Sequence, residues 1–297
     1  MNTVLITGAT GLLGSTLIPE LLRKRFKVVT HSQNSTADFQ ADFASQKATS
    51  EILDQVNPDI LINLIGLTNV DICEKNPNSA YITNTKIIEN ITNWIKSTQT
   101  PCHLIQISTD QVYDGYGPHN EDEITLTNYY AFSKYAGELI ASRVPSTILR
   151  TNFFGYSHCE KRQSLTDWLY SSLSDDIDIQ VFDDVMFSPL SMTTIAKMIQ
   201  FVIQKKHYGL FNLGSRSGMS KADFAFAFAG ELMLNTKRLQ RTTTDQVTFL
   251  KTYRPKDMRM DCTKFEEIFN IKLPQLSDEI RLSAKEYHEK TKSNFRN

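Results

Sequence analysis

Thr7-Gly8-Ala9-Thr10-Gly11-Leu12-Leu13-Gly14 follows the short apolar run Val4–Ile6 and opens an amphipathic stretch. A strand, a glycine-rich turn and a helix in this order are typical of dinucleotide-binding folds, because glycine permits a tight turn and a close approach of backbone to phosphate. The helix that begins at such a turn directs free N–H groups at a pyrophosphate. The stretch therefore predicts a cofactor site at Gly8, Thr10, Gly11, Leu12 and Leu13. A turn that serves packing alone is the weaker interpretation.

Short apolar runs alternate with helical patterns through the first half of the chain, which predicts βαβ units and a parallel sheet. Strands are expected at Val4–Ile6, Lys27–Thr30, Ile60–Leu64, His103–Ser108 and Ser146–Leu149. Helices are expected at about Leu12–Arg25, Ser50–Gln55, Asn78–Thr98 and Tyr129–Ser142. The fold class is therefore α/β, with a Rossmann-type doubly wound parallel sheet.

The alternation loosens after Arg150, which indicates a second, smaller α/β lobe for the substrate. Its expected elements are a helix near Leu165–Leu173, a strand at Ile179–Phe182, the aromatic core face of a helix within Lys221–Leu234, and helices near Thr263–Phe269 and Ser277–Glu289. A helix at Thr193–Gln204 leads to a strand at Gly209–Leu213 that could extend the first sheet. We expect residues 1–154, with a returning segment of about 190–214, to form the dinucleotide-binding domain. Residues 155–189 and 215–297 would form the substrate lobe.

Charge and composition exclude several classes of function. The formal net charge is −1, so no overall positive field would attract nucleic acid or an anionic membrane. No apolar stretch approaches the roughly 18–20 residues that span a bilayer, and no charged leader precedes the first strand. The four cysteines show no spacing typical of metal ligands, so no metal is expected. The protein is expected to be cytoplasmic.

Tyr130 and Lys134 are four residues apart at the start of a predicted helix and therefore share one face. A free tyrosine has a pKa of about 10, and the nearby ammonium is expected to lower the pKa of Tyr130 toward neutral pH. Thr109, at a strand end, can hydrogen-bond the same substrate oxygen. A carbonyl held by both hydroxyls would accept hydride and then take a proton from Tyr130. The neighbouring Tyr129 has Ser133, not a lysine, four residues on.

The end of the second strand bears on the choice of nicotinamide cofactor. NAD-binding folds usually carry an acidic residue there for the ribose 2′-hydroxyl, but this strand ends in Thr30-His31-Ser32-Gln33-Asn34. The absence of an acid favours NADP(H), with His31 and Ser32 as donors to a 2′-phosphate, although no arginine is present in this segment to bind it. NAD(H) stays open. Asp42 and Phe43 are expected beside the adenine, and a loop acid and a core aromatic are the alternative roles.

Several stretches resemble the extended short-chain dehydrogenase/reductases, most of all the dTDP-4-dehydrorhamnose reductases, over nearly the whole length. They are Asn63-Leu64-Ile65-Gly66-Leu67-Thr68-Asn69-Val70-Asp71, Ser108-Thr109-Asp110-Gln111-Val112-Tyr113-Asp114-Gly115, Leu149-Arg150-Thr151-Asn152-Phe153-Phe154-Gly155, Phe187-Ser188-Pro189 and Arg254-Pro255-Lys256-Asp257. Family members commonly have Ala-Ala where this chain has Leu64-Ile65, a His at Leu67, and Ser-Trp around Asn152. These departures leave the identity of the sugar open.

The resemblance implies NAD(P)H-dependent reduction of the C4 keto group of a nucleotide-linked 4-keto-6-deoxysugar, in deoxysugar and polysaccharide biosynthesis. It implies a catalytic set of Thr109, Tyr130 and Lys134. Cofactor contacts are implied at Leu64, Ile65, Gly66, Tyr130, Lys134 and Asn152, and substrate contacts at Leu67, Thr68, Asn152, Phe153, Phe187 and Arg254. The partner would be a nucleotide sugar, and a homodimer is left open.

Two alternatives to this reductase remain. The first is an NAD-dependent sugar-nucleotide epimerase or dehydratase on the same fold; a dehydratase normally has an Asp-Glu pair after the catalytic Thr, whereas this chain has Asp110-Gln111. The adjacent His158 and Cys159 give an epimerase little further support. The second alternative is a non-catalytic NAD(P)-binding regulatory subunit, in which Leu64 or Ile65 would block the pocket.

Overall fold

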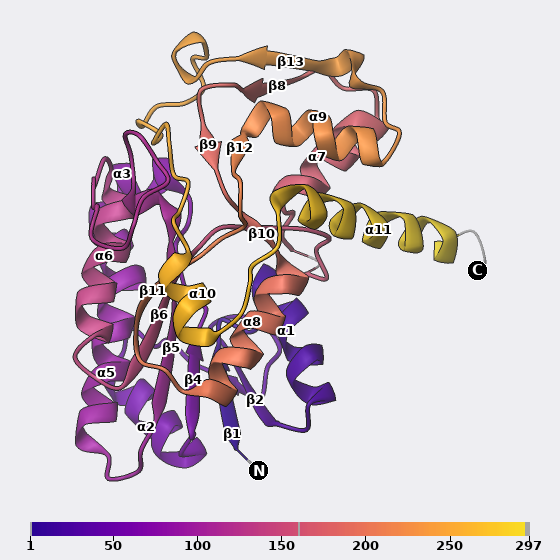
Figure 1. The fold of residues 1–297 in the computed structure, drawn as a ribbon. Helices are drawn as coiled ribbons and strands as arrows, with labels where there is room; N and C mark the ends of the chain where they lie inside the picture. Colours follow the sequence, from indigo (N-terminus) through magenta and orange to yellow (C-terminus); the bar gives the residue numbers. More distant parts are fainter. Residues whose placement is uncertain (1, 160, 295–297) are drawn as a thin grey trace.

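The computed structural model describes residues 2–159 and 161–294. Within them, seven parallel strands form the central sheet in the order β11-β6-β5-β4-β1-β2-β3 (Figure 1). Their bounds are β1 (Thr3–Thr7), β2 (Lys27–Ser32), β3 (Phe39–Gln40), β4 (Ile60–Asn63), β5 (His103–Thr109), β6 (Ser146–Thr151) and β11 (Gly209–Leu213). The expected doubly wound sheet is confirmed, and the returning strand β11 does pair with β6 at the sheet edge.

Helices cover both faces of this sheet. One face carries α1 (Leu12–Arg23), α8 (Met192–Lys205) and α10 (Thr263–Phe269), and the other carries α2 (Gln46–Val56), α5 (Ile87–Ser97) and α6 (Tyr129–Ala141) (Figure 1). Successive strand residues point to opposite faces. Val4 and Ile6 accordingly enter the core beneath α1, whereas Leu5 enters the core beneath α2 and α5. This double burial explains why the strands read as continuous apolar runs.

The expected helix at Asn78–Thr98 is divided. A short helix α4 (Pro77–Tyr81) passes into a π-helical turn η1 (Ile82–Lys86) before α5 begins. The short helix α3 (Val70–Lys75) and the two-residue strand β3 have no counterpart among the predicted elements. Periodicity over a dozen residues cannot detect a one-residue insertion in a helix or so short an element.

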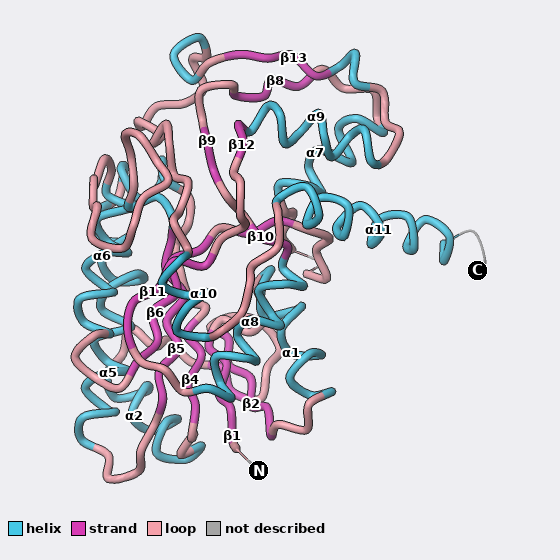
Figure 2. The backbone as a smooth tube through the Cα atoms, in the orientation of Figure 1, coloured by secondary structure: helices cyan, strands magenta, loops and turns pink. Residues whose placement is uncertain are grey.

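A second lobe has its own core. It contains α7 (Leu165–Ser174), α9 (Lys221–Glu231), α11 (Leu276–Asn294), the parallel pair β8 (Ile179–Phe182) and β13 (Leu239–Thr242), and the turns η3 (Thr236–Arg238) and η4 (Thr244–Gln246). Two further pairs lie where the lobes meet, β7 (Phe153–Phe154) with β10 (Leu190–Ser191) and β9 (Met186–Phe187) with β12 (Met219–Ser220). The chain passes between the lobes through these short strands and loops (Figure 2).

Candidate active site

The carboxyl ends of the strands open onto a cleft made of two adjoining cavities. The strand order reverses between β4 and β1, and ligands of such sheets bind outside the carboxyl ends at this point. The inner cavity lies beside β5 and α6, and the outer cavity lies beside the end of β2. The residues that line both are Gly8, Gly11, Leu64, Ile65, Gly66 and Arg162. A ligand that fills both cavities must therefore pass over the glycine turn.

The glycine turn fits a pyrophosphate. Gly8 has a φ of +69°, and a Cβ on it would lie 3.0 Å from the backbone of Leu64 and Ile65. Gly11 is the N-cap of α1 and provides no side chain to bond the free N–H groups of the first turn. Gly14 lets α1 lie close to the turn after β1, because a Cβ there would lie 2.2 Å from the carbonyl oxygen of Ala9. Free donors at a helix N-terminus beside an open cavity are what a phosphate requires.

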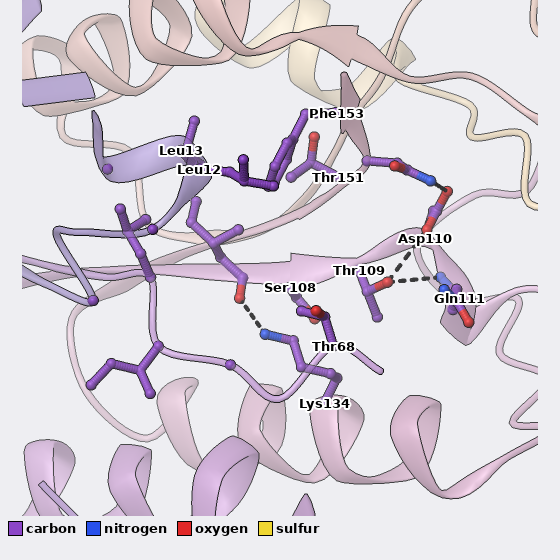
Figure 3. A pocket seen from close by; sticks show the side chains of 18 of the residues that line it. Leu12, Leu13, Thr68, Ser108, Thr109, Asp110, Gln111, Lys134, Thr151 and Phe153 are labelled. Atoms are coloured by element: carbon purple, nitrogen blue, oxygen red, sulfur yellow. Dashed lines mark hydrogen bonds between the residues drawn. The ribbon is translucent and has the colours of Figure 1, made fainter. Parts of the chain in front are cut away.

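Three side chains with proton-transfer chemistry meet in the inner cavity. Thr109 ends β5, and Tyr130 and Lys134 lie on the first two turns of α6, whose N-cap Asn128 accepts a bond from the N–H of Ala131. The Lys134 Nζ donates to the carbonyl oxygen of Ile107 at 2.7 Å (Figure 3). Burial lowers the pKa of Lys134 to about 8, and the charge of Glu138 opposes this effect.

The state of Tyr130 differs from the expected one. Burial raises the pKa of Tyr130 above its ordinary value, and a hydrogen bond with Thr109 lowers it by less. The expected lowering by Lys134 is therefore wrong for this structure, since the ammonium is directed at the Ile107 carbonyl instead. A tyrosine in this environment stays protonated at neutral pH and can act as a proton donor.

Asp110 is a buried carboxyl group that directly follows Thr109. Its Oδ2 accepts a hydrogen bond of 2.7 Å from the Nδ2 of Asn152 (Figure 3), and its Oδ1 lies 3.3 Å from the Thr109 hydroxyl. Burial raises the pKa of Asp110 to about 6, against the opposing effects of Asn152 and the Lys221 ammonium. Asp110 begins a 3₁₀ turn, η2 (Asp110–Val112), which has Gln111 as its next residue. The acidic partner of a dehydratase pair is thus present and its glutamate is not.

The loop after β4 is held by the π-helical turn. The side-chain oxygen of Asn84 accepts from the N–H of Leu67 at 2.8 Å, and its Nδ2 donates to the Leu67 carbonyl and to the Ser133 hydroxyl. Extra-residue turns of this kind often occur at functional sites. Leu67 consequently faces the outer cavity, while Thr68 lines the inner one. Asn84 is a positioning residue that the sequence reading missed, because its role depends on the π-helical turn.

The expected substrate residues are placed differently from one another. Phe153 lines the inner cavity with Leu12 and Leu13 (Figure 3). Phe187 is fully buried in the second core and lines neither cavity. Arg254 lines neither cavity and donates to Asp71 at 2.7 Å.

Lys221 forms a charged group with two residues of the substrate side. Its side chain is half-buried, and the charges of Asp110 and Arg254 shift the pKa of its ammonium in opposite directions, while burial lowers that pKa most. Its Nζ also lies over the ring of Phe187, 5.9 Å from the centroid. The sequence reading did not include Lys221, since its only local signal is a place at the start of a helix.

The outer cavity contains the residues expected at the adenosine. His31, Ser32, Asp42 and Phe43 all line it. The rings of His31 and Phe43 lie with centroids 3.9 Å apart, and the His31 Nε2 lies 3.0 Å from the Ala41 carbonyl oxygen. Burial lowers the pKa of His31, so the ring is neutral at neutral pH and adds no positive charge here.

Two cations that the sequence reading missed also line this cavity. Lys161 and Arg162 belong to the second lobe and follow the end of β2 by about 130 residues, yet they face the same space. The Lys161 Nζ lies 3.4 Å from the hydroxyl of Ser35. The segment at the end of β2 contains no arginine, but the packing of the two lobes brings Arg162 to the wall of this cavity.

A buried ion pair lies behind the inner cavity. Glu138 of α6 and Arg150 of β6 are both almost fully buried and join at 2.6 Å. Glu138 also accepts from the Ser108 hydroxyl, and Arg150 donates to Tyr113 and to the Glu121 carbonyl. The pair therefore fixes Ser108, near the end of β5, against α6, the helix that carries Lys134.

Two features of the described residues, 2–159 and 161–294, bear on other classes of site. No three His, Cys, Asp or Glu side chains gather there as a metal ion would need. None of the helices in those ranges is both long enough and apolar enough to cross a bilayer.

Several known proteins are similar to this chain over most of its length. A probable low-salt glycan biosynthesis reductase of Haloferax volcanii is 26% identical over 287 residues, 93% of this chain and 95% of that protein. A dTDP-4-dehydrorhamnose reductase of Aggregatibacter actinomycetemcomitans is 28% identical over 292 residues, 91% and 94% of the two chains. Methionine adenosyltransferase 2 subunit beta of Rattus norvegicus is 25% identical over 289 residues, 89% and 82%.

The fold also has solved relatives. The dTDP-4-dehydrorhamnose reductase of Bacillus anthracis, solved in complex with NADP, superposes with a TM-score of 0.85 over 96% of this chain and 99% of that chain, at 22% identity. The family described as the RmlD substrate binding domain matches residues 1–289. With this match and this strand order, the resemblance read from the motifs is confirmed: the chain belongs to the RmlD substrate binding domain family and has the extended short-chain dehydrogenase/reductase fold.

Proposed function

We propose that this protein reduces the C4 keto group of a nucleotide-linked 4-keto-6-deoxysugar with NADPH. The observation that carries the proposal is the meeting of Thr109, Tyr130 and Lys134 in one cavity that continues over the glycine turn. Relatives named as a dTDP-4-dehydrorhamnose reductase and as a glycan biosynthesis reductase support the substrate class. The segment Thr30–Asn34 at the end of β2 carries no acid, which supports NADPH over NADH.

The chemistry divides between the cofactor and the side chains. A bound nicotinamide supplies hydride to the carbonyl carbon. The Thr109 hydroxyl holds the carbonyl oxygen, and Tyr130 gives that oxygen a proton, because burial keeps its phenol protonated. The Lys134 ammonium lies close to Gly66: its Nζ is 3.8 Å from the position that a Cβ on Gly66 would occupy. Its positive charge would stabilise the negative charge that develops in this cavity.

Asn152 and Lys221 would act on the sugar side. Asn152 donates to Asp110, which keeps this carboxylate in place at the edge of the cavity as an acceptor for sugar hydroxyls. Lys221 lies close enough to Asp110 and Arg254 for their charges to shift its pKa, and its ammonium would add positive charge on the sugar side of Asp110. The division of the chain into a cofactor domain and a substrate lobe is part of the same proposal.

The test is oxidation of NADPH and NADH with a panel of nucleotide-linked 4-keto-6-deoxysugars. Tyr130→Phe should bind NADPH as the wild type does and lose turnover by about 10²- to 10⁴-fold, the usual contribution of a general acid. Tyr129→Phe is the matched control, since Tyr129 is the adjacent residue and is 48% exposed. A Tyr130→Phe variant that keeps most of the wild-type rate would overturn the assignment of the proton donor.

A second candidate is a non-catalytic subunit that binds NADP. The similarity to a protein named as a subunit, methionine adenosyltransferase 2 subunit beta, favours it. NADPH binding without turnover of any panel member, with equal inactivity of wild type and Tyr130→Phe, would support this candidate. An epimerase or dehydratase would instead carry tightly bound NAD⁺ through purification, which absorbance would reveal.

A further inference from the structure

We propose that Lys161 and Arg162 of the second lobe bind the two phosphate groups of the cofactor separately. Arg162 would bind the pyrophosphate, and Lys161 would bind the 2′-phosphate and so determine the preference for NADPH. The inference rests on the proposed function only for the class of cofactor, a nicotinamide adenine dinucleotide.

The two acids that follow β2 both accept hydrogen bonds from residues of their own segment. Asp38 accepts hydrogen bonds of 2.8 Å from both the N–H and the hydroxyl of Thr30. Asp42 accepts from the N–H of Ala44 at 2.9 Å. The remaining polar groups there are Ser32, Gln33, Asn34 and Ser35. Neutral donors of this kind admit a phosphate dianion, but they do not supply the charge that would make it bind tightly.

Lys161 supplies this charge. Its Nζ lies 3.4 Å from the Ser35 hydroxyl, at the edge where the 2′-oxygen of an adenosine ribose would lie beyond β2. Among the described residues it forms no ion pair, so its exposed ammonium has no competing carboxylate. Among the described residues, a cation with a hydroxyl neighbour and no ion-pair partner is arranged for an incoming anion.

Arg162 lies elsewhere along the same cleft. It lines both cavities, together with Gly8 and Gly11 of the glycine turn. The turn and the free N–H groups of α1 hold the pyrophosphate in folds of this kind. A guanidinium on the wall of the same cavities would reach this pyrophosphate, and its fork suits two phosphate oxygens. Neighbouring residues of one loop thus serve different phosphate groups.

The loop that carries the two cations is anchored at both ends. The Cys159 Sγ lies 3.2 Å from the carbonyl oxygen of Thr10, within the glycine turn. The Ser157 hydroxyl donates to the Arg162 carbonyl at 2.9 Å. At the other end, α7 begins with a capping box in which Ser164 and Asp167 exchange hydrogen bonds. These contacts hold the described residues on either side of Lys161 and Arg162, with Cys159 against the glycine turn.

The experiment compares the affinities of 2′-phospho-ADP-ribose and ADP-ribose by calorimetry. These ligands carry neither a nicotinamide nor a sugar substrate, so the result does not depend on turnover. Lys161→Ala should weaken binding of the 2′-phosphorylated ligand by about tenfold or more and leave that of ADP-ribose unchanged. Arg162→Ala should weaken both ligands by a similar factor. Lys237→Ala, which removes an exposed lysine of the second lobe outside both cavities, should change neither affinity.

Three outcomes would overturn the inference. In the first, the affinity ratio of the two ligands is the same for Lys161→Ala as for the wild type. In the second, Arg162→Ala leaves the affinities of both ligands unchanged. In the third, neither ligand binds the wild type, which would remove the cofactor site itself. By contrast, failure to reduce any nucleotide sugar, with the expected ligand affinities intact, would contradict the proposed reaction and leave the roles of Lys161 and Arg162 standing. Raising the salt concentration should reduce the preference for the 2′-phosphate, since both cations are exposed.

Discussion

Gly14→Ala should destabilise the protein, because α1 lies too close to the turn that precedes it. A Cβ on Gly14 would lie 2.2 Å from the carbonyl oxygen of Ala9 and 2.6 Å from its carbonyl carbon. Both are backbone atoms and cannot rotate away, so α1 must move by roughly 1 Å to reach ordinary contact distance. Overpacking of this kind costs about 1–3 kcal/mol. For a chain of this length the melting temperature should fall by roughly 2–6 °C.

Gly230→Ala is the matched control. Gly230 also lies within a helix, α9, but a Cβ there would have no atom within 4 Å. Alanine is favoured over glycine in a helix interior by about 1 kcal/mol. The same substitution should therefore raise the melting temperature by roughly 2 °C at this position. Opposite signs at the two glycines would separate the steric effect from the loss of chain entropy.

Cofactor binding gives a second measurement on the same variants. A displacement of about 1 Å at the start of α1 would break the hydrogen bonds that its free N–H groups give to a phosphate. Each such bond to a charged group contributes about 1.5–3 kcal/mol, so NADPH affinity should fall by about tenfold or more. Differential scanning fluorimetry and a fluorescence titration with NADPH measure the two effects. The reasoning is refuted if Gly14→Ala has the same melting temperature as Gly230→Ala and binds NADPH with the same affinity.

Further predictions concern titration and reactivity. Burial raises the pKa of Asp110 to about 6, above its unfolded value, so ionisation of this group costs stability as pH rises from about 4 to 6. Asp110→Asn should therefore raise the melting temperature more at pH 8 than at pH 4. An equal gain at both pH values would contradict this. NADPH oxidation should decline above about pH 8, as the Lys134 ammonium loses its proton. The charge of Glu138 raises the pKa of Lys134, so Glu138→Gln, assayed below its melting temperature, should move this decline to lower pH. Of the four cysteines, Cys159 should be alkylated first, since the other three are buried. Saturating NADPH should slow its alkylation, which mass spectrometry measures, because Cys159 lies against the glycine turn. Equal rates with and without NADPH would place Cys159 outside the cofactor cleft.

The first lobe could be predicted from the sequence because its signals are local. A glycine turn, continuous apolar runs and a 3.6-residue period each act within a few residues, and the strands beginning at Thr3, Lys27, Ile60, His103 and Ser146 follow from them. The same local patterns also predicted the returning strand β11. What the sequence left out depends on contacts between distant segments.

Three examples show the limit. Lys161 faces Ser35 only because the second lobe folds back over the cleft, and no spacing rule relates the two. The pKa of Tyr130 rises because its ring is buried, a quantity that the Tyr-x-x-x-Lys spacing does not contain. Phe187, expected at the substrate, lies in the second core, because apolar residues of a substrate wall and of a core read alike.

The returning segment has a consequence for synthesis of the chain. Helix α8 covers α1, and β11 completes the edge of the sheet. Both are translated only after α7, β8 and β9 of the second lobe. When residues 1–154 have emerged from the ribosome, the apolar face of α1 is therefore still exposed, because α8 has not yet been made. Because α10 packs beside β11 on the same side of the sheet, the core of the nucleotide-binding half is not complete until nearly the entire polypeptide has emerged. The two halves should mature together, and neither should be obtainable as a separate soluble fragment.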